Sequence, residues 1–277
     1  MQRIFVGGAI RTGTTLLQSI ICSSPDTHPL IHECQYLAEQ MHLFAKWRNN
    51  NSPYITHYFG TLENFHVFAR NLVEQLLAIA GEHIRPHRAI VLKCPHLSYY
   101  FGDLAEMLPD ARFIVCVRDP RDTIASMLDV AKRQSNNKEK GTLVDLGHDM
   151  EAFCRFFAQF YRPVFIALSA DRHGLKGRLL FIKYEDLVGN TATVVQNLAK
   201  FCNISLADFR IDQQWRAMPD YAASVSENNV WRTDLYGRGV SNERVGGHKD
   251  VLSADDIGVI DRLCADFYKI FGYRPAN

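Results

Sequence analysis

Several patterns that mark common protein classes are missing from this chain of 277 residues. Neither charge sign is in excess, because 31 Lys and Arg residues balance 30 Asp and Glu residues and leave a formal net charge of +1. Overall charge therefore gives no support for a nucleic-acid partner or a membrane surface. No apolar run approaches the roughly 20 residues of a membrane span, and the N-terminal QRIFVGGAI has the pattern of a buried strand, not of a targeting leader. We expect a soluble, cytoplasmic protein, although a luminal domain separated from its anchor would have the same pattern.

Disulfide and metal-binding patterns are also missing. The seven cysteines are scattered and form no C-x-x-C pair, and several lie inside apolar runs. We expect them to be small buried hydrophobic residues in a reducing compartment. The histidine-rich stretch HPLIHECQYLAEQMH does not have the H-E-x-x-H spacing of a zinc site. The sequence therefore predicts no metal.

Short β-branched apolar runs alternate with helical patterns along most of the chain. Strands are expected at 3–8, 88–95, 111–120 and 177–187, and helices at about 14–23, 97–108, 121–133 and 190–202. This alternation predicts an α/β fold with a parallel sheet of about four to five strands, covered by helices on both faces in three layers. A hydrophobic content of 47% is sufficient for one substantial core. Ligands of such sheets bind beyond the carboxyl ends of the strands, where this chain places polar residues.

Three segments depart from the alternation. Residues 34–86 hold two helical patterns rich in aromatic residues, which suit ordinary packing helices or a helical cap over an acceptor. The polar segment 131–142 predicts an exposed loop. The long irregular stretch 219–252 is of a length that is often functional. We therefore expect a single domain over 1–277, with a cap insertion at about 34–86 and a C-terminal closing segment at about 219–277.

The stretch GGAIRTGTT, residues 7–15, has the frame of a phosphate-binding loop. Backbone N–H groups at such a turn, together with the following helix N-terminus, form a cradle for an anion. The hydroxyls of Thr12, Thr14 and Thr15 can add donors. The lysine that nucleotide triphosphatases place after the second glycine is replaced by Thr14, and Arg11 supplies a cation three residues earlier. A plain strand-to-helix turn would also fit this frame.

A second stretch, RDPRDTIAS at 118–126, strengthens the interpretation. Asp119 and Pro120 form a helix N-terminal signature. Arg118 at the strand end and Ser126 two turns into the helix can converge on one phosphate through charge-assisted hydrogen bonds. Alternatively, Arg118 pairs with a nearby aspartate and Ser126 only packs. Because the strand ends in Arg118 and not in a metal-holding aspartate, the pattern favours an anion bound without magnesium.

Four motifs together resemble those of sulfotransferases that use 3'-phosphoadenosine 5'-phosphosulfate (PAPS). They are GGAIRTGTTLL, LKCPHLSYYF, LPDARFIVCVRDPRDTIASML and KYEDL. Their order and spacing over about 3–190 are more similar to bacterial members and to the tyrosylprotein sulfotransferases than to the cytosolic steroid and phenol enzymes. The resemblance implies a P-loop-like core and an enzyme that moves a sulfuryl group to an acceptor hydroxyl, in line and without a metal.

The resemblance also implies roles for individual residues in binding the donor. The 5'-phosphosulfate would be held by Arg11, Thr12, Gly13, Thr14, Thr15 and Leu16. Arg118 and Ser126 would hold the 3'-phosphate. Tyr184, in the family's YED position, would lie against the adenine; a tyrosine at a strand end can equally be a core residue.

Catalytic candidates follow from the same resemblance. Arg11 and Lys93 would stabilise the charge that builds on the leaving phosphate oxygen, although a lysine at a strand end can also be a surface charge. Glu33 lies at about the position of the catalytic glutamate in the tyrosylprotein enzymes and is the first choice of base. His96 is the rival, because the cytosolic enzymes carry a catalytic histidine shortly after the corresponding lysine. His28 and His32 are weaker candidates.

The C-terminal part departs from the family pattern. Gly247 and His248 stand where bacterial relatives often have Arg-Trp, and Arg238, Arg244 and Lys249 remain as candidates to close over the nucleotide. Two alternatives stay open: a metal-dependent small-molecule kinase, and a catalytically silent protein that binds 3',5'-adenosine bisphosphate (PAP). Aromatic residues in 36–68 are compatible with a phenol, peptide, lipid or glycan acceptor. The sequence leaves the acceptor and the oligomeric state open.

Overall fold

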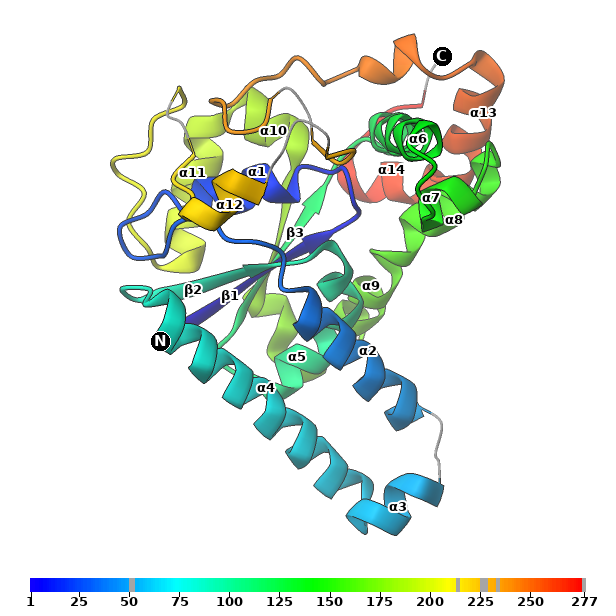
Figure 1. The fold of residues 1–277 in the computed structure, drawn as a ribbon. Helices are drawn as coiled ribbons and strands as arrows, with labels where there is room; N and C mark the ends of the chain where they lie inside the picture. The colour runs from blue at the N-terminus through cyan, green and yellow to red at the C-terminus, as the bar shows by residue number, and fades with distance from the viewer. Residues whose placement is uncertain (50–52, 213–214, 225–228, 233–234, 276–277) are drawn as a thin grey trace.

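A parallel sheet forms the centre of the molecule. The computed structural model describes residues 1–49, 53–212, 215–224, 229–232 and 235–275. Its strands are β1 (Gln2–Gly8), β2 (Ala89–Lys93), β3 (Arg112–Val117) and β4 (Leu179–Lys183). They pair in the order β2-β1-β3-β4, and every pair is parallel. All four carboxyl ends therefore lie at one edge of the sheet (Figure 1), and the predicted α/β class is confirmed.

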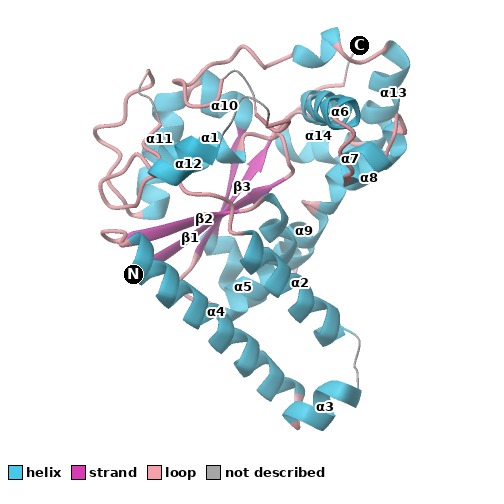
Figure 2. Ribbon diagram, in the orientation of Figure 1, coloured by secondary structure: helices cyan, strands magenta, loops and turns pink. Residues whose placement is uncertain are grey.

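Both faces of the sheet are buried. Ile4 and Val6 belong to one apolar cluster, whereas Phe5 between them belongs to the other. Consecutive strand side chains point to opposite faces, so the near-continuous apolar runs of these strands require a helical layer on each side. The result is three layers (Figure 2).

Helices α1 (Thr14–Ile21), α10 (Tyr184–Gly189) and α11 (Thr191–Cys202) contribute to the first cluster. The second cluster draws on the short 3₁₀ helix η1 (Pro95–Tyr100) and on α5 (Phe101–Met107), α6 (Pro120–Asn136), α8 (Met150–Gln159), α9 (Arg162–Ser169), α13 (Ala254–Leu263) and α14 (Ala265–Phe271). The shorter elements are α7 (Thr142–Asp145), η2 (Arg172–Arg178), α12 (Pro219–Ser224) and η3 (Gly247–Asp250).

Some predicted boundaries were wrong. The loop expected over 131–142 begins later, because α6 continues to Asn136. The polar residues there are good helix formers, and Ala131 and Gln134 on the inner face of the helix are buried. Similarly, the strand expected to reach 120 ends at Val117, since the Asp119 side chain caps α6 by accepting from the Arg121 N–H. The helix expected over 97–108 is divided into η1 and α5.

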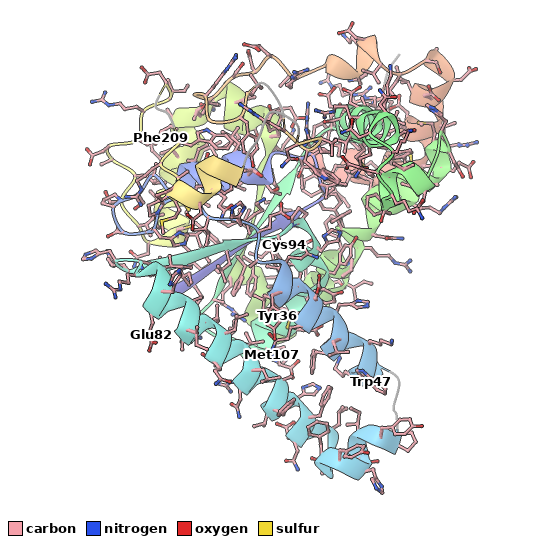
Figure 3. The ribbon with its side chains drawn as sticks, in the orientation of Figure 1. Tyr36, Trp47, Glu82, Cys94, Met107 and Phe209 are labelled. Carbon is pink, nitrogen blue, oxygen red and sulfur yellow. The ribbon has the colours of Figure 1, made fainter. Side chains whose placement is uncertain are left out.

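Three helices between residues 35 and 49 and between 53 and 84 form an arm that projects from the body of the molecule (Figure 1). It consists of α2 (Gln35–Asn49), α3 (Pro53–Phe59) and α4 (Leu62–Ile84). Two ion pairs, Arg48–Asp103 and Arg3–Glu74, join the arm to the core. Tyr36 and Cys94 lie near its root and Trp47 toward its far end (Figure 3). Side chains of the three helices line an apolar cavity of about 390 Å³ that is open to solvent and includes aromatic residues such as Trp47.

Two further features concern the cysteines and the lengths of the helices. All seven cysteines are unpaired, and six of them are buried, as expected for small core residues. None of the helices in the described ranges is both long enough and apolar enough to cross a membrane.

Candidate functional site

A cavity of about 600 Å³ lies beyond the carboxyl edge of the sheet. Its walls come from the loop after β1, one face of α6, the start of α10 and described residues between 215 and 251. The predicted donor-binding residues lie around it: the loop residues from Arg11 to Leu16 apart from Thr12, together with Arg118, Ser126 and Tyr184. The fold thus brings together groups that are more than 170 positions apart in the sequence.

The loop has the backbone shape that its glycines require. Gly8 and Gly13 have φ values of +124° and +92°, a region that side chains with a Cβ rarely adopt. A Cβ on Gly13 would also lie 2.5 Å from Cδ2 of Tyr184, so only glycine allows this ring to pack on the loop. Arg11 itself has a positive φ of 69°, which marks local strain at this position.

The three threonines of the loop have different roles. The Thr12 hydroxyl donates to the Ala9 carbonyl at 2.7 Å and is fully buried. It stabilises the turn and does not line the cavity. Thr14 and Thr15 do line the cavity, so two of the three predicted hydroxyls reach the place where an anion would bind.

Arg11 reaches across the cavity toward α6. Its Nε donates to Ser126 Oγ at 3.1 Å, and its Nη1 donates to the Trp231 carbonyl at 2.7 Å. Burial, together with the positive charges of Arg133 and Arg118, lowers the pKa of Arg11 to about 10. Arg11 therefore remains protonated at neutral pH, and its guanidinium lies at the predicted 3'-phosphate position in this conformation.

Arg118 is held from several sides. Its guanidinium lies 4.5 Å from the centre of the Tyr184 ring, a cation–π contact. Its Nη groups donate to the carbonyls of Arg11 and Arg244, and it also pairs with Asp122 at 3.7 Å. Within the described residues, its Nε is buried and has no hydrogen-bond partner. Because Arg118 lines the cavity, its positive charge favours an anion there.

The C-terminal segment forms the outer wall. The carboxylate of Asp122 accepts from the backbone N–H groups of Gly246 and His248, and from Nδ1 of His248. Of the three cationic candidates for closure, only Arg244 lines the cavity; Lys249 does not, and Arg238 borders a separate surface hollow.

Several cavity residues were not singled out from the sequence. Arg133 on α6 and the indole rings of Trp215 and Trp231 line the same space. Helical periodicity from Ser126 would have placed Arg133 on the same face of α6. No sequence signal indicated the two tryptophans.

Glu33 and Lys93 form a pair at the root of the arm. Lys93 is almost fully buried, and its Nζ lies 2.5 Å from Glu33 Oε1 and 3.1 Å from Thr15 Oγ1. A backbone bond from Cys34 N–H to the Lys93 carbonyl fixes the two segments side by side. Lys93 thus connects the exposed carboxylate of Glu33 with Thr15, in the loop region that follows β1.

The three histidine candidates have different surroundings. His96 packs against the rings of Tyr99 and Phe160, and burial lowers its pKa, which the charge of Glu33 opposes. His28 is structural, because its Nε2 accepts from Val91 N–H and its Nδ1 donates to the Pro29 carbonyl. His32 contacts the ring of Tyr221. Across the described ranges, no three His, Cys, Asp or Glu side chains gather as a metal site.

Comparison with known proteins identifies this arrangement. A sequence model described as the sulfotransferase family matches residues 3–208. The chain belongs to the sulfotransferase family. As a sulfotransferase it is a PAPS-dependent transferase that moves a sulfuryl group, and nothing favours the kinase or the silent binding protein over this activity.

Relatives and solved structures agree with the assignment. The sulfotransferase is 24% identical over 280 residues to protein-tyrosine sulfotransferase 1 of Danio rerio, which covers 99% of this chain and 73% of the relative. It is 22% identical over 208 residues to the protein-tyrosine sulfotransferase of Drosophila melanogaster, covering 75% of this chain but only 39% of the relative.

Among solved structures, the sulfotransferase domain from the curacin biosynthetic pathway superposes with a TM-score of 0.59 at 18% identity, over 99% of this chain and 98% of that one. A mouse sulfotransferase in complex with PAP gives a TM-score of 0.51 at 15% identity, over 97% and 85%.

Proposed function

We propose that the sulfotransferase transfers the sulfuryl group to a phenolic hydroxyl of the tyrosyl type, with Glu33 as the base and Lys93 at the leaving oxygen. The observation that carries this proposal is the position of Lys93, whose Nζ contacts both Glu33 and Thr15. A group that activates an acceptor and a loop that holds a donor are thereby adjacent. Similarity to protein-tyrosine sulfotransferases supports the acceptor class.

The reaction is a single in-line displacement. The acceptor oxygen attacks sulfur while its proton passes to the Glu33 carboxylate. The bond between sulfur and the bridging oxygen breaks, and its electron pair stays on the 5'-phosphate of PAP. Lys93, Thr15 and the loop N–H groups stabilise the charge that develops there. Because these cations and dipoles are fixed before reaction, the displacement needs no divalent ion.

The donor is held by the large cavity. In this proposal Arg118, Ser126 and Arg11, which line the cavity, hold the 3'-phosphate. Thr14 and Thr15, which also line it, hold the 5'-phosphosulfate. Since one face of Tyr184 is covered by Arg118, the adenine stacks on the indoles of Trp215 or Trp231, and Tyr184 acts by supporting Arg118.

Two measurements test this function. PAP in excess over its Kd should raise Tm in the presence of EDTA, with a stabilisation of about 2.7 kcal/mol at 100 times the Kd, whereas ATP should not. Transfer of labelled sulfate from PAPS should favour a tyrosine-containing peptide over aliphatic alcohols and glycans. A transfer that requires magnesium, or a preference for aliphatic hydroxyls, would contradict the proposal.

A cytoplasmic location is the second part of the proposal. It is supported by seven free thiols, a pattern typical of proteins in reducing compartments. Fractionation of cells that express the full native protein tests it, and recovery in a membrane-enclosed or secreted fraction would contradict it.

A further inference from the structure

One buried carboxylate joins two walls of the donor cavity. Asp122 lies in the first turn of α6, and its side chain is 2% exposed. Oδ1 accepts from the backbone N–H of His248 at 3.0 Å and from Nδ1 of the same residue at 2.7 Å. Oδ2 accepts from the Gly246 N–H at 2.8 Å and lies 3.7 Å from an Nη of Arg118. The partners on the C-terminal side are 124 to 126 positions away in the chain.

The same turn is attached to Arg118 at a second point, because an Nη of Arg118 donates to the Arg244 carbonyl. Asp122, Arg118 and the turn from Arg244 to His248 therefore form a closed set of contacts. Each member fixes the orientation of the others, and Arg118 is the residue whose buried Nε still lacks a partner among the described residues.

A carboxylate is an unexpected group at this place. A negative charge beside a phosphate site repels the ligand, and a buried charge is tolerated only when its hydrogen bonds are satisfied. Asp122 accepts three hydrogen bonds and lies beside the cationic Arg118. The carboxylate is therefore well satisfied, although its negative charge disfavours the binding of an anion nearby. This combination indicates that the carboxylate contributes structure to the site and not an attraction to the ligand.

We propose that Asp122 is the positioning residue of the 3'-phosphate site, which holds the Arg244–His248 turn against Arg118 and so gives the enzyme its selectivity for 3'-phosphorylated nucleotides. The proposal rests on the placement of the donor described under Proposed function. Asp122 acts through Arg118 and the turn and does not touch the ligand.

The direction in which one substitution changes the affinity for PAP distinguishes a positioning role from a purely electrostatic effect. Asp122→Asn removes a negative charge near the phosphate site, which alone would tighten the binding of an anion. It also replaces one carboxylate oxygen, which accepts hydrogen bonds, by an NH₂ group. This NH₂ group would face the donors of Gly246 or His248 and could not accept from them. Positioning therefore predicts that the Kd of PAP rises at least tenfold by calorimetry, whereas the Kd of 5'-AMP, which lacks the 3'-phosphate, changes less than twofold.

A matched control is available on the same helix. Asp129 lies two turns further along α6 and also borders the cavity, but none of the described hydrogen bonds ties its carboxylate to the C-terminal turn. Asp129→Asn also removes one negative charge beside the cavity, and the Kd of this variant for PAP should stay within twofold of wild type or fall. In steady-state assays Asp122→Asn should raise the KM for PAPS and leave kcat at saturation close to wild type.

His248 provides an independent pair of variants if Asp122→Asn does not fold. His248→Asn keeps a side-chain donor for Asp122 and should bind PAP nearly as wild type, whereas His248→Ala should weaken PAP at least threefold and leave 5'-AMP unaffected. Equal losses for both nucleotides, or unchanged or tighter PAP binding in Asp122→Asn, would overturn the proposal. If wild type itself does not bind PAP, the donor assignment fails as well; if it binds PAP normally, only the role of Asp122 is at stake.

Discussion

The substitution Glu33→Gln separates catalysis from donor binding. Glutamine keeps the shape of the side chain and an oxygen that can accept from Lys93 Nζ, but it cannot take a proton from an acceptor hydroxyl. Glu33 is linked to the loop after β1 through Lys93, whose Nζ contacts Glu33 Oε1 and lies 3.1 Å from Thr15 Oγ1. Lys93 can retain both hydrogen bonds in the variant, and the cavity that holds the nucleotide is unaltered.

The size of the expected effect follows from these contacts. Loss of a general base lowers kcat by about 10²–10⁴-fold, which corresponds to roughly 3–5 kcal/mol of transition-state stabilisation. The side chain of Glu33 is 45% exposed and that of Lys93 3%, so solvent screens the ion pair from the Glu33 side and its contribution to stability is on the order of 1 kcal/mol. The loss of activity should therefore greatly exceed any loss of stability.

The assay combines single-turnover transfer of labelled sulfate with calorimetric titration of PAP. We expect Glu33→Gln to lose turnover while the Kd of PAP stays within about twofold of wild type. His96→Ala is the matched control, because this ring lies near Glu33 and the two residues compete for the same role. If Glu33→Gln retained full activity and His96→Ala lost it, the assignment of the base would be refuted.

Three further substitutions test other parts of the structure. Arg118→Ala should raise the Kd of PAP by about 10–100-fold, since hydrogen bonds to charged groups contribute roughly 1.5–3 kcal/mol; an unchanged Kd by calorimetry would place the 3'-phosphate elsewhere. Gly13→Ala should destabilise the protein by about 1–3 kcal/mol in urea unfolding, because φ is +92° and the new Cβ would meet Tyr184; wild-type stability would show that the loop can relax. Burial lowers the pKa of His28 in the folded protein. In the unfolded chain this histidine has a pKa of about 6.5. Below that pH the unfolded state therefore binds more protons than the folded state, and the free energy of unfolding falls as the pH drops. His28→Gln should flatten the dependence of Tm on pH between about 6.5 and 5, and a slope equal to wild type would contradict this.

Local patterns were sufficient to predict much of the fold. The apolar runs at 3–8 and 111–117 become β1 and β3 because their residues are buried on both faces, and such runs are recognisable without knowledge of tertiary contacts. The start of α6 was also predictable, because its two signals, a capping aspartate and a proline at the first helical position, lie within one turn of the helix. The prediction for the end of α6 is wrong because polarity alone does not mark a loop; helix propensity and the burial of Gln134 decide the structure there.

The candidate site was predictable only where a side chain acts close to its own strand end. The loop, Arg118 and Lys93 follow directly from buried strands, so their common edge could be expected. The direction of the Arg11 side chain could not, because it depends on Ser126 and on the carbonyl of Trp231, which is 220 positions away. The contacts of Asp122 with the C-terminal turn could not be predicted either, because they join residues that are 124 to 126 positions apart. The roles assigned to these residues stay predictions until the variants are measured.

The outer wall of the donor cavity comes from residues that follow the whole sheet in the chain. Arg11 and Arg118 belong to the first half of the chain, but the carbonyls that receive their hydrogen bonds belong to Trp231 and Arg244. A nascent polypeptide can thus complete its sheet while the nucleotide site still lacks one side. Donor affinity should arise only after the residues up to Val251 have left the ribosome, so a shorter nascent chain would not sequester PAPS from finished enzyme molecules.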